Sequence, residues 1–173
     1  MIFLISFQPT KESLASYKKE FGDDYFSFWY SGVKFIVLNS QLFFEPSLVP
    51  EHQEEQEKWL NNELKNDKWK HLLIFQHIPW FLRDPNEATH SYFNLEVNKR
   101  LKWLEIFNKA GVTKIFCGHY HQNTIGQYKN IEHITTSAVG AQLGEDKHGY
   151  RLVEVDENQI RHRYISVTDT VNE

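Results

Sequence analysis

Apolar residues recur along the chain with two different spacings, one typical of helices and one typical of strands. Helical spacing places Leu14, Tyr17 and Phe21 on one face, with Thr10 as a cap before them and Gly22 as a stop after them. The same reasoning predicts two further helices, from Glu51 to Asn66 and from Asn94 to Ala110. The acidic run Glu54-Glu55-Gln56-Glu57 is expected to form the solvent-facing side of the second helix.

Short runs of β-branched and aromatic residues predict eight strands. They are Tyr25–Trp29, Val33–Leu38, Leu72–Gln76, Val112–Cys117, Thr124–Tyr128, Glu132–Ser137, Tyr150–Val155 and Gln159–Ile165. The first two flank Ser31-Gly32 and are expected to form a hairpin, and a loop is expected around Pro46 and Pro50. Strands separated by helices early in the chain, then strands in direct succession, predict an α/β domain with sheet packed on sheet and helices outside.

Composition narrows the class of protein. The chain has 173 residues, 40% of them hydrophobic and 15% aromatic, which is enough for one core. A net charge of −4 leaves no basic footprint, so nucleic acid is not expected as a partner. The single cysteine, Cys117, excludes an intramolecular disulfide framework, suits a reducing compartment and is expected to be buried. No apolar run reaches membrane-spanning length, so the expected location is the cytosol, away from the membrane.

Three histidines stand directly after predicted buried strands. Gly118-His119-Tyr120-His121 follows the strand that ends at Cys117, and His77 follows the strand that ends at Gln76. In layered α/β proteins this end of a strand is where ligands bind. Side chains at i and i+2 on an extended strand lie on the same side, and Gly118 permits a backbone turn that gives them different directions. His119 and His121 can then address two adjacent metals, with His77 completing one of the two coordination spheres.

Four other polar residues are candidates with two interpretations each. Asn39 and Gln41 could lie beside the metals or contact substrate, or could instead form local turn hydrogen bonds. Asn123 could orient a metal ligand or belong to a turn. His148 could contact phosphate or be an exposed loop residue. The remaining histidines have no site-like context: His52, His71, His90, His133 and His162.

These motifs resemble those of a known family. The histidine after a strand in Gln76-His77-Ile78-Pro79 and the closing Gly118-His119-Tyr120-His121 resemble motifs of the calcineurin-like metallophosphoesterases. The chain is most similar to the calcineurin-like phosphoesterase domain-containing proteins, which are described as cytosolic serine/threonine protein phosphatases. Further segments that carry this resemblance are residues 21–29, 37–41, 92–94, 137–144 and 148–149.

The resemblance implies a fold, a cofactor and a set of ligands. The fold is the α/β metallophosphoesterase sandwich of two sheets flanked by helices, and the cofactor is a pair of divalent metals (Mn, Fe or Zn). His77 and His119 match ligands of one metal, and His121 matches a ligand of the other. Residues 9–166 correspond to the C-terminal part of such a domain, residues 1–8 are an atypical start, and residues 167–173 form a C-terminal tail.

The chain also departs from the family pattern. Family members carry Asp-x-His, Gly-Asp-x-x-Asp and Gly-Asn-His-Asp/Glu before the segment that matches Pro9, and none of these stands in this sequence. We therefore expect weak metal binding and apolar surface exposed along one sheet edge or face. The implied function is metal-dependent hydrolysis of phosphoesters, in phosphoserine or phosphothreonine proteins or in small molecules. The alternatives are a weakly active or inactive form that binds metal or protein, and a phosphodiesterase. The sequence leaves the oligomeric state open.

Overall fold

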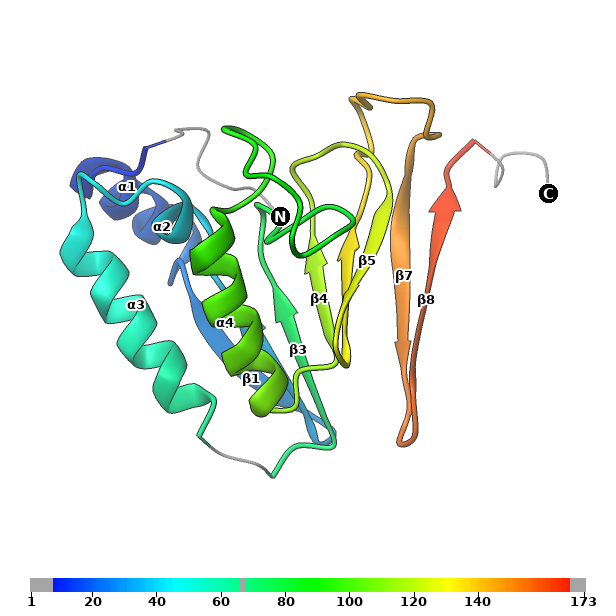
Figure 1. The fold of residues 1–173 in the computed structure, drawn as a ribbon, viewed down its shortest axis with the longest axis horizontal. Coiled ribbons are helices and arrows are strands. Elements are labelled where there is room, and N and C mark those ends of the chain that lie inside the picture. Colours follow the sequence, from blue (N-terminus) through cyan, green and yellow to red (C-terminus); the bar gives the residue numbers. More distant parts are fainter. Residues whose placement is uncertain (1–7, 66–67, 169–173) are drawn as a thin grey trace.

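The computed structural model describes residues 8–65 and 68–168, which form two sheets and a set of helices (Figure 1). The larger sheet has six strands in the order β1-β2-β3-β4-β6-β5, and the smaller is the hairpin β7-β8. The strands are β1 (Phe26–Tyr30), β2 (Val33–Val37), β3 (His71–Phe75), β4 (Lys114–Cys117), β5 (Thr124–Tyr128), β6 (Ile131–Thr135), β7 (Gly149–Val155) and β8 (Ile160–Ser166). The helices are α1 (Lys11–Phe21), α2 (Gln41–Phe44), α3 (Pro50–Glu63) and α4 (Val97–Lys109). The predicted α/β sandwich is confirmed.

Local sequence signals set the ends of the first elements. Thr10 and Ser13 form a reciprocal capping box at the start of α1, and Gly22 ends the helix with φ 85°. Ser31 and Gly32 both have positive φ, 49° and 81°, in the two-residue turn between β1 and β2. That conformation matches the twist of an antiparallel hairpin, so the predicted hairpin forms at the predicted place.

The middle of the larger sheet is parallel. β2 pairs with β3, β3 with β4, and β4 with β6, all in parallel register. The carboxyl ends of these strands therefore meet at one edge of the sheet, which brings the segments after Phe75 and Cys117 together.

One face of this sheet is covered by helices. α3 and α4 run along it (Figure 1). The side chains between them and the sheet are fully buried, and they include Leu60, Trp80, Trp103 and Phe107. This layer contains most of the hydrophobic core.

The other face carries a second, smaller cluster and is only partly covered. Val153, Val155 and Ile160 of the hairpin β7-β8 pack on a group that includes Leu73 and Phe116. The edge strand β1 lies beyond the hairpin: its Phe26, Phe28 and Tyr30 are 40%, 46% and 74% exposed. Apolar surface was expected at one sheet edge or face, and this is where it lies.

The structure corrects three expectations. Residues 41–44, for which no helix was predicted, form the one-turn helix α2, whose Leu42 and Phe43 are buried. Gln56, expected on the wet side of α3, is fully buried and bonds to the backbone of Asn39. Helix α4 begins at Val97 instead of Asn94, because the Glu96 side chain caps the amides of Asn98 and Lys99.

Most of the two predicted terminal segments, residues 1–8 and 167–173, lies outside the described residues. Within the described ranges no helix is long and apolar enough to cross a membrane. Cys117 is buried, as predicted, and burial raises the pKa of its thiol.

Candidate metal centre

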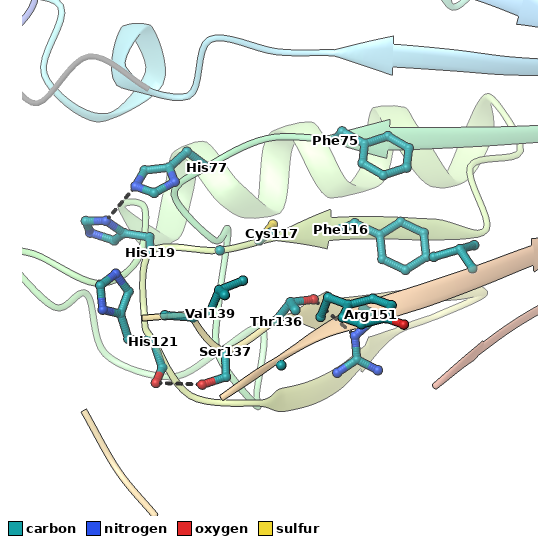
Figure 2. Close-up of a pocket in the computed structure, with 15 residues that line it drawn as sticks. Phe75, His77, Phe116, Cys117, His119, His121, Thr136, Ser137, Val139 and Arg151 are labelled. Carbon is teal, nitrogen blue, oxygen red and sulfur yellow. Dashed lines mark hydrogen bonds between the residues drawn. The ribbon is translucent and has the colours of Figure 1, made fainter. Parts of the chain in front are cut away.

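The rings of His77 and His119 meet at the carboxyl ends of β3 and β4 (Figure 2). The distance from His77 Nε2 to His119 Nδ1 is 3.2 Å, and the ring centroids are 4.9 Å apart. Two imidazole nitrogens at about 2.0–2.1 Å from one tetrahedral ion are separated by roughly 3.3 Å. The spacing therefore suits two ligands of a single metal, and that this pair binds one stays a prediction.

A main-chain group holds the His119 ring in place. His119 Nε2 lies 2.7 Å from the carbonyl oxygen of Tyr92, and the Tyr92 ring stacks on the imidazole with centroids 4.7 Å apart. A carbonyl only accepts, so Nε2 carries the proton and donates it. In the neutral ring the lone pair is then on Nδ1, the atom that faces His77. Metal-binding histidines are commonly oriented by such a second hydrogen bond.

Burial keeps both rings neutral near physiological pH. It lowers the pKa of His77 to about 4, and the positive charges that His119 and His121 could carry lower it further. Burial also lowers the pKa of His119, against the opposing effect of the Tyr92 carbonyl. Because a metal binds the neutral imidazole, neither ring has an imidazolium proton to lose first, and His119 Nδ1 accepts from His77 Nε2–H at 3.2 Å.

His121 reaches the same place by a backbone turn that the sequence attributed to the wrong residue. Gly118 does not have positive φ; His119 and His121 do, at 67° and 55°. Left-handed conformation is uncommon for residues other than glycine and often marks functional sites. Figure 2 shows the His121 ring beside that of His119, on the side away from His77. The two histidines are thus aimed by their own strained backbone.

A cavity of about 530 Å³ opens beside the three histidines. It runs between the carboxyl ends of β3 and β4 and the first residues of β7, and its lining changes from imidazoles to the rings of Phe75 and Phe116. Arg151 and Ser137 also line it. The Ser137 hydroxyl donates to the carbonyl oxygen of His121 at 2.9 Å and supports the turn.

The donor set fits part of a metal centre. His77 and His119 have the spacing and the neutral charge that suit a shared divalent ion, and His119 has the matching tautomer. In residues 8–65 and 68–168, however, no group of three or more His, Cys, Asp or Glu side chains is close enough together to hold an ion. In the described chain His77 and His119 are placed as two ligands of one ion would be, and the His121 ring lies beside that of His119.

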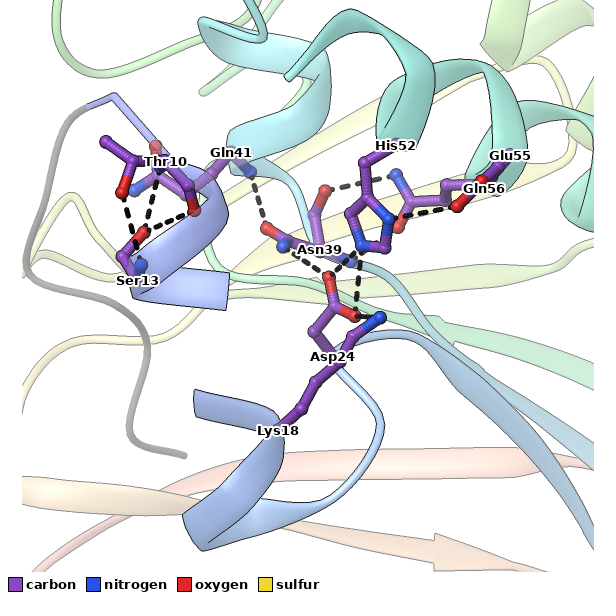
Figure 3. Close-up of polar contacts among 9 residues, drawn as sticks. All are labelled: Thr10, Ser13, Lys18, Asp24, Asn39, Gln41, His52, Glu55 and Gln56. Carbon is purple, nitrogen blue, oxygen red and sulfur yellow. Dashed lines mark hydrogen bonds and ion pairs between the residues drawn. The ribbon is translucent and has the colours of Figure 1, made fainter. Parts of the chain in front are cut away.

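Asn39 and Gln41 do not line this cavity; they belong to a separate hydrogen-bond network (Figure 3). Asn39 donates to Asp24 at 2.8 Å and accepts from the Gln41 amide at 3.1 Å, which is the local-turn alternative. His52 also contacts Asp24, at 3.0 Å. Burial alone would raise the pKa of Asp24, but the bonds from Asn39 and His52 outweigh it and lower the pKa. This network joins α1, β2 and α3 as a structural unit.

The positions of Asn123 and His148 match the structural one of the two interpretations given for each. The Asn123 side chain accepts from Arg151 Nη2 at 2.8 Å and from the Ser137 amide at 3.3 Å, so it joins the loop after β4 to β7. His148 is exposed, and its Nδ1 lies 2.8 Å from the Val139 carbonyl. Neither lines the cavity beside the histidines.

Sequence reasoning missed Tyr92 and Arg151 as parts of this region. Tyr92 contributes a backbone carbonyl, which no side-chain pattern reveals. Arg151 is half-buried and bonds to Thr136 and Asn123. The sequence did contain one signal for Arg151. An arginine at an inward-facing position of a predicted strand needs buried hydrogen-bond acceptors for its guanidinium.

The fold is that of the metallophosphoesterases. It is similar to purple acid phosphatase PPD1 of yellow lupin, with TM-score 0.59 and 15% identity, covering 98% of this chain and 33% of that one. A dimetal phosphatase from Danio rerio matches with TM-score 0.56 and 17% identity, covering 88% of this chain and 66% of that one. No protein-family model matches the chain.

The sequence is similar to a particular phosphatase. Serine/threonine-protein phosphatase CPPED1 of Danio rerio is 48% identical over 162 residues, which cover 92% of this chain and 52% of the relative. The resemblance to calcineurin-like phosphoesterase domain-containing proteins is therefore confirmed. The chain spans about half the length of the curated relatives it matches.

Proposed function

We propose that this chain provides the histidine side of a two-metal phosphoester hydrolase that acts on phosphoserine and phosphothreonine in proteins. The observation that carries the proposal is the 3.2 Å approach of His77 Nε2 to His119 Nδ1, with His119 Nε2 held by the Tyr92 carbonyl. The phosphatase fold and the name of the CPPED1 relatives support the substrate class. The single, buried Cys117 supports a cytosolic location.

The residues of the chain have separate tasks in this proposal. His77 and His119 would hold one divalent ion, and His121 would contribute to a neighbouring one. When bound, such a pair of ions neutralises phosphate charge and makes water a stronger nucleophile. The Tyr92 carbonyl keeps the His119 lone pair on Nδ1, and burial keeps His77 unprotonated at pH 7.

Metal titration tests the binding part of the proposal. Calorimetry with Mn²⁺ and with Zn²⁺ should detect binding that His119→Ala abolishes. His71→Ala is the matched control, because His71 begins the strand β3 that His77 follows, and it should bind like the unmodified chain. Equal affinity for all three proteins would contradict the ligand assignment.

Hydrolysis assays test the activity part. With metal present, a phosphoserine peptide and an aryl phosphate monoester should be hydrolysed faster than an aryl diester, and His119→Ala should remove the difference from background. Preference for the diester would instead assign a phosphodiesterase.

A second candidate is metal binding without turnover. It is favoured because, in the described residues, no group of three or more His, Cys, Asp or Glu side chains is placed to hold an ion. Metal binding that depends on His119, together with no hydrolysis of any of the three substrates, would select this candidate over the first.

A further inference from the structure

The segment between β3 and α4, residues 76–96, carries the carbonyl that orients His119, and we call it the Tyr92 loop. The structure describes all of this segment and assigns no helix or strand to it, so ladder hydrogen bonds do not set its path. Its path matters, because a displacement of about 1 Å would stretch the 2.7 Å bond from His119 Nε2 to the Tyr92 carbonyl beyond hydrogen-bonding distance. Side chains of the loop and of α4 supply the bonds that hold it.

A buried arginine fixes the base of the Tyr92 loop. Arg100, on α4, has no exposed surface. Its Nη1 donates to the carbonyl oxygens of Pro85 and Glu87, at 3.3 Å and 3.0 Å. Its Nε donates to the carbonyl oxygen of Leu95 at 3.0 Å. A guanidinium is costly to bury without hydrogen bonds, so Arg100 and these three carbonyls stabilise one another.

The Glu87 carboxylate joins the two sides of the Tyr92 loop. Its oxygens accept from the amides of Leu82, Arg83 and Asp84, at 2.7 Å, 3.0 Å and 3.2 Å. They also accept from Asn94 Nδ2 at 2.8 Å. Burial alone would raise the pKa of Glu87, but these bonds outweigh it and lower the pKa. The carboxylate is therefore charged at neutral pH, and charged acceptors form the stronger hydrogen bonds.

A turn within the Tyr92 loop is centred on His90. The His90 amide donates to Asn94 Oδ1 at 2.6 Å. The His90 ring accepts at Nδ1 from the amides of Tyr92 and Phe93, at 3.2 Å and 3.3 Å. A side-chain acceptor that binds the amide two residues further on is typical of an Asx turn, and here an imidazole nitrogen replaces the asparagine oxygen. Because backbone amides only donate, Nδ1 of His90 carries a lone pair.

His90 and His119 bind opposite ends of one peptide group. The Tyr92 carbonyl and the Phe93 N–H belong to the same peptide, and in a trans peptide they point in opposite directions within one plane. The N–H points at His90 Nδ1, so the carbonyl points away from His90, and His119 Nε2 lies there at 2.7 Å. His90 had no site-like context in the sequence, yet it is one peptide group away from a candidate ligand.

We propose that His90 is a positioning residue of the metal centre: by accepting from the Phe93 amide it aims the Tyr92 carbonyl at His119 and keeps the His119 lone pair on Nδ1. Glu87 and Arg100 hold the loop in the path that this requires. The residues that line the cavity beside the histidines do not include His90, so it acts through the peptide group. The proposal rests on the proposed function in one respect, that His119 binds a metal.

Nuclear magnetic resonance of the metal-free chain reads the tautomer directly. Long-range proton–nitrogen spectra at neutral pH should show His119 protonated at Nε2, with its signals assigned by their loss in His119→Ala. His90→Leu removes the acceptor and should give a mixture of His119 tautomers. His90→Asn should restore the single Nε2–H form, because an asparagine oxygen accepts from the amides that follow it in a turn. Ser91→Ala changes the next exposed residue and is the control.

Calorimetry with Zn²⁺ extends the test to ligand binding. His90→Leu should weaken Zn²⁺ binding about 10-fold, as is usual when the outer hydrogen-bond partner of a metal ligand is lost. His90→Asn and Ser91→Ala should bind like the unmodified chain, and thermal melts confirm that every variant folds. No Zn²⁺ binding by any of these proteins would contradict the proposed function alone, and the tautomers would still decide the role of His90.

Three outcomes would overturn the proposal. The first is an unmodified chain in which His119 carries its proton on Nδ1. The second is a His90→Leu variant that keeps the tautomer, or the measurable Zn²⁺ affinity, of the unmodified chain. The third is a His90→Asn variant that behaves like His90→Leu, which would reduce the effect of His90→Leu to a general disturbance of the loop.

Discussion

The two faces of the larger sheet differ in how completely they are covered. The helix side has fully buried side chains from α3, α4 and four strands, and its Trp80, Trp103 and Phe107 have no exposed surface. The strand side has a small cluster under β7-β8, and beyond it Phe26, Phe28 and Tyr30 of β1 are 40%, 46% and 74% exposed. The face covered by helices therefore has a fully buried layer of side chains. On the face covered by β7-β8 the buried layer ends partway across the sheet.

This difference indicates where stability and association reside. Burial of apolar area is the main favourable term in folding, so the helix side should dominate the free energy of unfolding. The strand side keeps part of its apolar area exposed. The histidines lie at the border between the two regions, attached to strands that the helix side holds in place.

The largest difference in stability is expected between two variants that each remove one ring, one from each face of the sheet. Phe107→Ala should lower the free energy of unfolding by about 3–5 kcal/mol, because it leaves a cavity in a closed layer. Phe28→Ala should lower it by less than about 1 kcal/mol, since the ring is already 46% exposed. Urea denaturation measures both values, and equal losses would mean that the faces contribute alike.

The next largest loss of stability is expected from replacing a buried polar residue on the helix side. Gln56 exchanges two hydrogen bonds with the backbone of Asn39, at 2.8 Å and 3.1 Å. Gln56→Ala should cost about 1–3 kcal/mol, because it leaves those backbone groups buried and unpaired. Glu54→Ala, in the exposed run of the same helix, is the control and should leave the urea midpoint unchanged. A similar loss in the control would contradict the burial of Gln56.

Acid should weaken the helix side through His133. This ring is fully buried on β6, accepts from the Trp80 amide at 3.2 Å, and burial lowers its pKa to about 3. The unfolded state binds the proton more readily, so stability is present above pH 6.5 and falls progressively as the pH drops from 6.5 toward 3. Between pH 7 and 5 the loss should be about 1–2 kcal/mol for His133, with His77 adding to it.

Denaturation at a series of pH values checks this expectation. His133→Gln should flatten the pH dependence while lowering stability at pH 7. An unchanged pH dependence in the variant would assign the acid sensitivity to other groups.

The smallest effect is expected where the hairpin meets the rest of the strand side. Lys70 and Glu157 form an exposed ion pair at 2.9 Å, with side chains 52% and 82% accessible. Solvent and salt screen such a pair, so Glu157→Gln should not change the urea midpoint measurably at physiological ionic strength. A clear loss would show that the hairpin depends on this contact.

The sequence predicted the elements whose patterns are local. All eight strands appear, and the hairpin turn at Ser31-Gly32 forms because both positions accept positive φ. Helix α2 was missed because four residues are too few to show a period. Gln56 was misplaced because its burial depends on Asn39, 17 residues away, and not on its charged neighbours.

The candidate site was predictable in its residues but not in its geometry. Two strands that each end in histidine are enough to predict that His77 and His119 meet at one sheet edge. The turn at His119 and His121 contradicts the usual preference for glycine, so the rule pointed to Gly118 instead. The Tyr92 carbonyl comes from a long loop whose path is set by tertiary packing.

The Tyr92 carbonyl makes the orientation of His119 insensitive to point mutation at position 92. Every amino acid carries a main-chain oxygen, so a substitution at position 92 removes the stacked ring but keeps the acceptor 2.7 Å from Nε2. Only a change in the length or path of the loop between Phe75 and Val97 would withdraw it. The orientation of His119 is therefore preserved by substitutions at position 92. It is vulnerable to insertions and deletions in this loop, although His77 is the one proposed ligand that the loop contains.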